Sequence, residues 1–237
     1  MNYFTNIDAV LFDLDGTLIE HTWQLSQLTA TLFAQFQEAL TPLTEPEFFE
    51  VYWGKSADMW SMMVDGLIDG NTAQQYSYQN TLRSLQKDTA LAPAMVQAWD
   101  KLVLAEAAPF DETYEVLQTV RPHFATGIVT NGYTSLQQAK LEHYNLINAV
   151  DFCLISEEAK SPKPNPAIFA QALQKAGNIS PERAVFIGDT LGSDIEGALN
   201  SGLHAVFINP KDDQTPPPGV PKVKNLQEFL QLLSFQR

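Results

Sequence analysis

Short apolar runs rich in β-branched and aromatic residues recur along the chain, and each has the length of a buried strand. These runs occupy residues 7–12, 127–130, 152–155, 184–187 and 205–208. Segments with helical periodicity lie between the later runs, near 135–143, 166–176 and 193–200. Strands that alternate with helices predict a parallel sheet with right-handed crossovers. The predicted fold class is therefore α/β, with a doubly wound, Rossmann-like parallel sheet as its core.

The first run is separated from the second by more than a hundred residues, which is far too long for an ordinary connection. Helical periodicity recurs in this interval, near 22–40, 72–87 and 93–105. Thr44-Glu45-Pro46-Glu47 has the pattern of a capping box with proline in the first turn, which predicts another helix start. The interval therefore predicts an inserted α-helical cap domain. We expect a core from residues 1–19 and 108–237 and a cap from residues 20–107, with hinges near 19–21 and 107–110.

The C-terminal part predicts one irregular stretch and one last helix. Residues 211–224 are rich in proline, which predicts an extended loop. The amphipathic segment 226–233 predicts a terminal helix that closes the core, and residues 111–120 predict a helix that leads back into it.

Composition narrows the range of functions. A chain of 237 residues with 45% hydrophobic residues can bury a sizeable core. Its net charge of −14 argues against nucleic acid or an anionic membrane as partner. The single cysteine, Cys153, excludes an intrachain disulfide and a metal site with several cysteines. Neither a basic leader nor an apolar run of membrane-spanning length is present, so we expect a cytoplasmic protein.

Two carboxylates stand where the first strand is predicted to end. Asp13 and Asp15 directly follow the run 7–12, and Gly16 then allows a sharp turn. Ligands of open α/β sheets bind outside the carboxyl ends of the strands, so we expect both carboxylates in that crevice. Two close anions favour a divalent cation with oxygen ligands, such as Mg²⁺. The alternative is a solvated turn, because Asp-Gly is a common turn dipeptide.

Hydroxyl, amide and ammonium groups follow the later strands. Thr130 and Asn131 can donate to phosphoryl oxygens, although Thr-Asn-Gly on its own is more often an ordinary loop. Lys163 lies between two prolines that stiffen its loop, and its ammonium would neutralise phosphate charge. Lys160 is the rival cation.

Two more carboxylates follow the run 184–187. Asp189 would complete a metal site together with Asp13. Asp194 could hold a metal-bound water, orient Lys163 or cap the next helix. We rank such a supporting role above direct contact with the metal.

These pieces together resemble the four motifs of the haloacid dehalogenase-like (HAD) hydrolase superfamily, most of whose members are phosphatases. The matching segments are FDLDGT, VTNG, KPNPAIF and FIGDTLGSDIEGALNSGL, in that order. The resemblance covers residues 7–19 and 110–210 and is strongest to the branch with a helical C1-type cap. TNGYTSLQQAKLEHYNL and ISEE are similar to pyrimidine-nucleotide phosphatases and N-acylneuraminate-9-phosphatases. The chain departs from its relatives before Lys163, where Lys160-Ser161-Pro162 replaces their usual Gly-Val.

We assign Asp13 as the nucleophile that forms an aspartyl-phosphate. Asp15 would be the general acid for the leaving oxygen and then the general base for water. Thr130, Asn131 and Lys163 would bind the phosphoryl group. The resemblance implies that the backbone carbonyl of Asp15 joins Asp13 and Asp189 as a Mg²⁺ ligand.

The predicted function is a Mg²⁺-dependent phosphomonoester hydrolase acting on a small phosphorylated metabolite, such as a nucleoside monophosphate or a sugar phosphate. The acidic balance of the cap argues against a second phosphate anchor, and Tyr52 or Trp60 could stack a base. The alternatives are a 2-haloacid dehalogenase or a phosphonate hydrolase of the same superfamily, or a non-catalytic binding protein. We expect a monomer or a homodimer.

Overall fold

The computed structural model describes residues 3–21 and 25–235, and the description below is limited to them. Six parallel strands form the main sheet, in the order β5-β4-β1-β6-β7-β8. Their bounds are Phe152–Ile155 (β5), Ala125–Thr130 (β4), Ala9–Phe12 (β1), Ala184–Gly188 (β6), His204–Ile208 (β7) and Lys222–Val223 (β8). The predicted α/β class and the parallel sheet are therefore confirmed. The short β8 is an exception to the loop predicted for residues 211–224.

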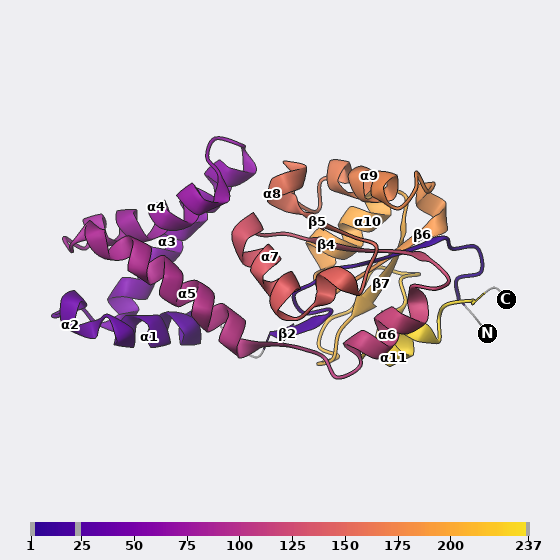
Figure 1. Cartoon of the computed structure of the whole chain (residues 1–237), viewed down its shortest axis with the longest axis horizontal. Coiled ribbons are helices and arrows are strands. Elements are labelled where there is room, and N and C mark those ends of the chain that lie inside the picture. Colours follow the sequence, from indigo (N-terminus) through magenta and orange to yellow (C-terminus); the bar gives the residue numbers. More distant parts are fainter. Residues whose placement is uncertain (1–2, 22–24, 236–237) are drawn as a thin grey trace. The chain divides into compact units, whose positions relative to one another are not determined.

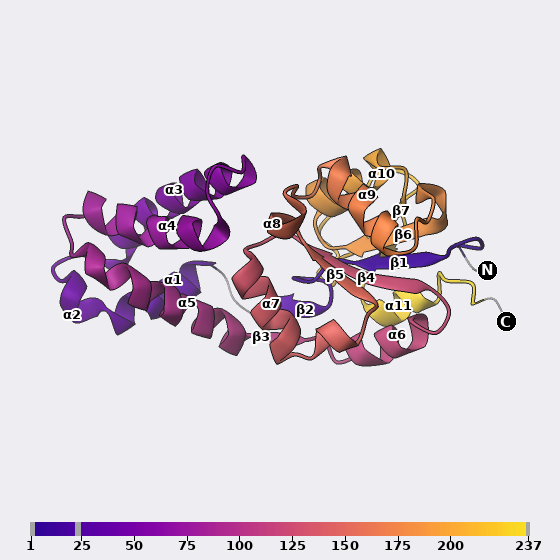
Figure 2. The same ribbon diagram turned by 45° about the horizontal axis from the view of Figure 1, so that its top comes forward.

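Strand β1 lies inside this sheet, between β4 and β6, and helices cover both faces of the sheet (Figures 1 and 2). Its register aligns Ala9 with Ala125 of β4 and with Ala184 of β6. Successive side chains of a strand point to opposite faces. Leu11 accordingly joins the apolar cluster under α9 (Pro166–Lys175) and α10 (Gly197–Asn200). Phe12 instead contacts Phe229 of α11 (Leu226–Leu230), with ring centroids 5.9 Å apart.

Several short helices and turns surround this sheet. They are α6 (Thr113–Val120), α8 (Ser156–Ala159), the 3₁₀ turns η2 (Leu146–Asn148) and η3 (Pro181–Arg183), and the π-helical turn η4 (Leu191–Glu196). The helix predicted for 193–200 is thus a π turn followed by a short α-helix. The terminal helix is also shorter than predicted, because α11 ends at Leu230.

Helices fill the long interval after β1. They are α1 (Leu25–Gln35), α2 (Gln37–Leu40), α3 (Glu45–Val64), α4 (Gly70–Ser84), η1 (Thr89–Leu91) and α5 (Ala92–Glu106). Helix α3 begins with the predicted capping box, in which Glu47 accepts a hydrogen bond from the backbone N–H of Thr44 at 2.8 Å. The first residues of the helix predicted for 22–40 lie outside the described residues. The remainder is divided into α1 and α2.

Two compact units make up the chain. The first comprises Met1–Glu20, Pro109–Gly132 and Leu141–Arg237, and the second comprises His21–Ala108 and Tyr133–Lys140. A two-stranded ribbon of β2 (Ile19–His21) and β3 (Ala107–Pro109) carries the chain out of the first unit and back into it. Residues 133–140, most of which lie in α7 (Thr134–His143), belong with the inserted helices, and no pattern in the sequence indicates this.

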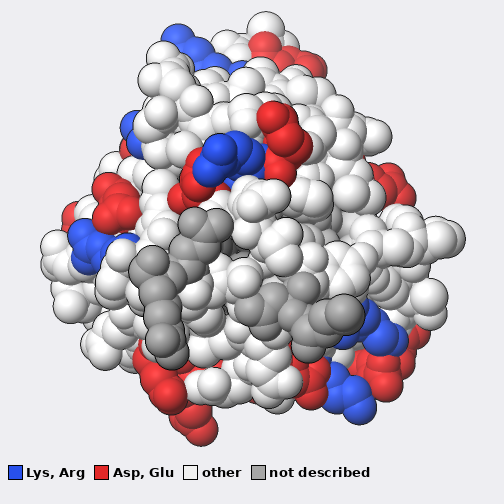
Figure 3. Space-filling model, turned by 90° about the vertical axis from the view of Figure 1, so that its right-hand side faces the viewer, with Lys and Arg blue, Asp and Glu red and all other residues white. Residues whose placement is uncertain are grey.

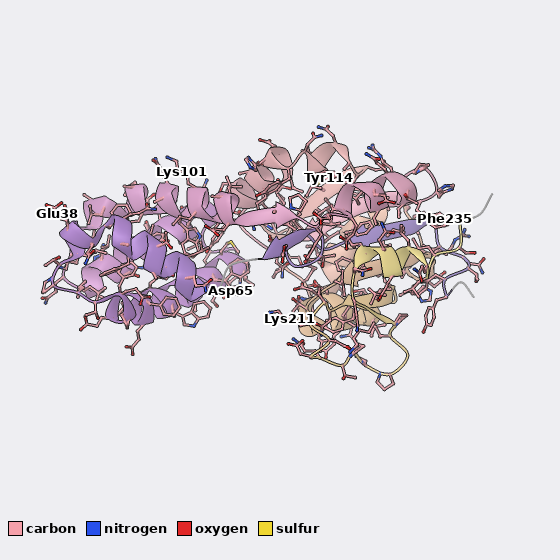
Figure 4. The ribbon with its side chains drawn as sticks, turned by 90° about the horizontal axis from the view of Figure 1, so that it is seen from below. Glu38, Asp65, Lys101, Tyr114, Lys211 and Phe235 are labelled. Atoms are coloured by element: carbon pink, nitrogen blue, oxygen red, sulfur yellow. The ribbon has the colours of Figure 1, made fainter. Side chains whose placement is uncertain are left out.

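Aromatic side chains form the interior of the second unit. Tyr52 is only 5% exposed and stacks on Tyr78, with ring centroids 4.9 Å apart. Phe48 and Trp99 pack against the same ring. Tyr52 is therefore a packing residue, and the expectation that it stacks a substrate base is wrong. Charged side chains such as Lys101 of α5 project outward from this unit (Figure 4).

Several basic groups of this acidic chain form ion pairs with nearby carboxylates. Arg183 lies 2.5 Å from Asp8, and Lys222 forms an ion pair with Asp212. One face of the molecule shows blue and red side chains next to one another and no broad basic area (Figure 3). In the described part of the chain, no helix combines the length and the apolar character needed to cross a bilayer.

Candidate active site

The carboxyl ends of β1, β4 and β6 bring the predicted site residues of the first unit to one edge of the sheet. Asp13 directly follows β1, and its backbone N–H donates to the carbonyl of Ile187 at 2.9 Å. Thr130 is the last residue of β4, and Asp189 directly follows β6. Neighbouring parallel strands end at the same edge, so three residues far apart in sequence become neighbours.

Lys163 reaches this edge from the loop before α9 and is almost completely buried. Its Nζ lies 2.6 Å from Oδ1 of Asp13 and 2.8 Å from Oδ1 of Asp194. Burial alone would lower the pKa of Lys163, but Asp13 and Asp194 outweigh that effect and raise it above its ordinary value. The charged ammonium form is therefore favoured at the site. Lys160, the rival in the sequence, is exposed and caps the end of α8.

Three carboxylates surround this single cation. One carboxylate oxygen each of Asp13, Asp189 and Asp194 lie within 4.8 Å of one another. Burial raises the pKa of Asp13 well above its ordinary value, although Lys163 opposes that rise. Burial, and next to it the charge of Asp194, raise the pKa of Asp189 to about 6. Both shifts show that ionising these carboxyl groups together is costly while Lys163 is the cation beside them.

This set of donors fits a hard divalent cation. Buried carboxylate oxygens that converge on one point are the ligands that Mg²⁺ takes in proteins. The sequence predicts Asp13 and Asp189 as metal ligands and ranks a supporting role for Asp194 above direct contact. In the structure all three carboxylates belong to the cluster. Asp15 lies at the turn after β1, where its backbone forms an isolated β-bridge with Ile19. The resemblance implies that its backbone carbonyl, and not its carboxylate, is a metal ligand.

The side chain of Asn131 forms two hydrogen bonds to the backbone of Lys163. Its Nδ2 donates to the carbonyl of Lys163 at 2.9 Å, and its Oδ1 accepts from the N–H of Lys163 at 2.8 Å. Both polar atoms thus help to hold the backbone of the lysine loop, much as a neighbouring strand would. Asn131 positions Lys163 in this geometry. Because its amide has two N–H groups, the donation of the other one to a phosphoryl oxygen stays a prediction.

Asp194 is fixed from both sides. Its Oδ2 accepts a hydrogen bond from the backbone N–H of Thr190 at 3.0 Å, while Oδ1 binds Lys163. Only 1% of the residue is exposed. One of the roles predicted for Asp194 is to orient Lys163. The geometry is compatible with that role, because the same carboxylate joins the start of η4 to the lysine.

Comparison with known proteins identifies the family. The family model of the haloacid dehalogenase-like hydrolases matches residues 7–202. The chain belongs to the haloacid dehalogenase-like hydrolases. It is 30% identical to the pyrimidine 5'-nucleotidase YjjG of Escherichia coli over 229 residues, which cover 95% of this chain and 97% of that protein.

Solved structures agree with the fold of this hydrolase. A 2-haloacid dehalogenase from Pseudomonas syringae superposes with a TM-score of 0.73 at 22% identity, covering 95% of this chain and 97% of the other. The HAD-hydrolase YfnB of Bacillus subtilis, solved with magnesium bound, superposes with a TM-score of 0.68 at 21% identity, covering 96% and 99%. Both likenesses concern the fold.

Two glycines make room for the carboxylates of this hydrolase, and sequence reasoning missed one of them. A Cβ on Gly16 would come within 2.1 Å of Oδ2 of Asp189, and Gly16 also has a φ of +86°. A Cβ on Gly188 would lie 2.5 Å from both Cβ and Oδ2 of Asp194. The only signal for Gly188 was its position between a predicted strand and Asp189.

Replacing Gly188 with alanine should therefore move Asp194 away from Lys163. Since the clash reaches Cβ of Asp194, a side-chain rotation cannot relieve it. We expect kcat for an aryl phosphate to fall roughly 10²-fold, the scale of a misplaced catalytic group. The control is Gly192→Ala, because a Cβ there has open space. Equal activity of the two variants, with thermal unfolding unchanged, would show that Asp194 need not hold this position.

Proposed function

We propose that this hydrolase cleaves phosphomonoesters through a covalent aspartyl-phosphate on Asp13. The observation that carries the proposal is the position of Asp13, buried at a strand end, 2.6 Å from Lys163 and within 4.8 Å of two further carboxylates. A dianionic phosphoryl group cannot approach that many carboxylates unless cations offset the charge. One lysine together with a divalent cation supplies that balance, and both would also stabilise charge on the phosphoryl oxygens.

The reaction would take two displacements at phosphorus. A carboxylate oxygen of Asp13 forms a bond to phosphorus while the bond to the leaving oxygen breaks, and Asp15 gives that oxygen its proton. Asp15 then takes a proton from a water molecule, whose oxygen attacks phosphorus and breaks the bond to Asp13. Free phosphate leaves and both carboxyl groups return to their starting states. Lys163 remains protonated throughout, since its ion pairs raise its pKa.

A bound Mg²⁺ would lie among Asp13, Asp189 and the Asp15 carbonyl, with Asp194 adjacent, and would offset phosphoryl charge. The magnesium-bound relative YfnB supports the choice of ion. Asn131 would keep Lys163 pointing at Asp13 through the two backbone hydrogen bonds described above. Thr130, which is buried at the end of β4, would contribute its hydroxyl on the phosphoryl side.

A 2-haloacid dehalogenase is the main alternative, and several solved structural neighbours carry that name. Such an enzyme also uses an aspartate nucleophile, but a halide leaving group needs no proton. Asp15 therefore has a purpose in phosphate ester chemistry that it lacks in dehalogenation. The similarity to a pyrimidine 5'-nucleotidase over nearly the whole of both chains favours a small phosphorylated metabolite as substrate.

One assay separates the two chemistries. Incubated with Mg²⁺, the protein should release phosphate from p-nitrophenyl phosphate and should release no chloride from 2-chloropropionate. The physical reason is that the acidic cluster with Mg²⁺ suits a phosphoryl group and Asp15 suits a leaving oxygen that takes a proton, and 2-chloropropionate offers neither. Chloride release without phosphate release would overturn the proposal.

A further inference from the structure

An aromatic pocket in the second unit has no part in the chemistry described so far. It encloses about 300 Å³, and its lining residues are Trp53, Ser56, Ala57, Trp60 and Tyr133, all of the second unit. Four of them lie on one face of α3, at the i, i+3, i+4 and i+7 spacing of a helix. The rings of Trp60 and Tyr133 meet edge to face, with centroids 5.7 Å apart.

The exposure of Trp53 is unusual for so large an apolar side chain. It is 55% exposed, whereas Tyr52 and Trp99 of the same unit are buried. A solvent-exposed tryptophan next to two further aromatic rings is typical of a binding site for a flat apolar group. The lining includes no charged side chain. A second phosphate or a carboxylate on the substrate would therefore find no counter-charge among these residues.

Two hydroxyl groups line the pocket, those of Ser56 and Tyr133. Ser56 follows Tyr52 by one helical turn on α3 and is half-buried, so it lies next to the packed interior of its unit while it also lines the pocket. A hydroxyl beside aromatic rings can bond to the polar edge of a planar ring.

Chain connectivity ties this pocket to the proposed phosphoryl site. Tyr133 follows Asn131 by two residues and Thr130 by three. Three residues of fully extended chain span at most about 11 Å, so the backbone of Tyr133 lies within that distance of Thr130. This limit holds wherever the two units lie. A phosphoryl group that contacts Thr130 and a base that contacts Tyr133 would therefore be bound by neighbouring residues of the chain.

We propose that the Trp53–Trp60–Tyr133 pocket binds the base of a nucleoside monophosphate, stacked on these rings and contacted by the Ser56 hydroxyl. This inference rests on the proposed phosphatase activity, since it names the leaving group of that reaction. A three-carbon sugar phosphate would leave the rings unfilled. A sugar acid would bring a carboxylate without a partner.

The test compares kcat/KM for uridine 5'-monophosphate with kcat/KM for ribose 5-phosphate, which carries the same phosphoryl group without a base. In Trp53→Ala the ratio should fall about 10- to 100-fold, the scale of one lost base–aromatic stacking contact. Trp53→Phe should recover part of the loss, because it keeps an aromatic face. Tyr76→Ala is the matched control: Tyr76 is 45% exposed on α4 and does not line the pocket, so it should leave the ratio unchanged.

A binding measurement separates failure of this inference from failure of the proposed function. Quenching of tryptophan fluorescence by uridine 5'-monophosphate in Asp13→Asn should saturate, and Trp53→Ala in that background should weaken the affinity about 10-fold or more. An unchanged ratio together with unchanged affinity would overturn the pocket assignment. Saturable binding that depends on Trp53, in a wild-type protein that hydrolyses no phosphate ester, would overturn the phosphatase proposal and leave the base pocket standing.

Discussion

Asp13→Asn should have no measurable turnover and should fold normally. An amide is a poor nucleophile, so the covalent step cannot begin. The replacement keeps the shape of the side chain, and the backbone bond from residue 13 to Ile187 is unaffected. Lys163 retains a partner in Asp194, so no buried cation is left alone. The measurements are phosphate release from p-nitrophenyl phosphate and the midpoint of thermal unfolding.

Asp15→Asn is the comparison that distinguishes the two carboxylates. It should lower kcat by about 10²–10⁴-fold, the usual contribution of a general acid and base. The loss should be smaller for p-nitrophenyl phosphate than for an alkyl phosphate, because nitrophenolate leaves without a proton. Near-normal turnover of Asp13→Asn would mean that water attacks phosphorus directly, and the covalent scheme would have to be abandoned.

Removal of divalent metal should abolish activity, and added Mg²⁺ should restore it. The reason is electrostatic: without a second cation, a phosphate dianion would enter a cluster in which three carboxylates face one lysine. The measurement is the initial rate after treatment with a chelator, followed by titration with Mg²⁺.

Asp189→Asn sharpens the metal experiment. The substitution removes one proposed ligand charge, so the Mg²⁺ concentration for half-maximal rate should rise while the nucleophile stays intact. Asp212→Asn is a suitable control, because that exposed carboxylate pairs with Lys222 elsewhere on the first unit. Full activity in the chelator would eliminate the metal from the mechanism.

Much of the fold could be predicted because its signals are local. The runs before Asp13 and Asp189 are apolar on both faces, as strands buried between two layers of helices must be. Asp13 and Lys163 could be found because each follows or precedes a predicted element at a characteristic spacing. The parallel sheet then brings strand ends together without further information.

The missing parts depend on contacts that no local pattern encodes. The hydrogen bonds of Asn131 to the Lys163 backbone link residues 32 positions apart. The need for glycine at position 188 arises from the carboxylate of Asp194 folding back against it. Tyr52 and Trp53 are adjacent aromatic residues on one helix, and only the packing of α3 shows that the first is buried and the second is exposed.

The inclusion of Tyr133–Lys140 in the second unit limits how that unit can be exchanged between relatives. A chimera that replaces only residues 21–108 would keep the old Leu136, whose partners in the apolar cluster of α1, α3, α4 and α5 would then be foreign. The same graft would separate Tyr133 from the tryptophans that share its pocket. A transplanted second unit therefore has to bring residues 133–140 with it. Recombination at β2 and β3 alone would divide a unit that is built from two segments of the chain.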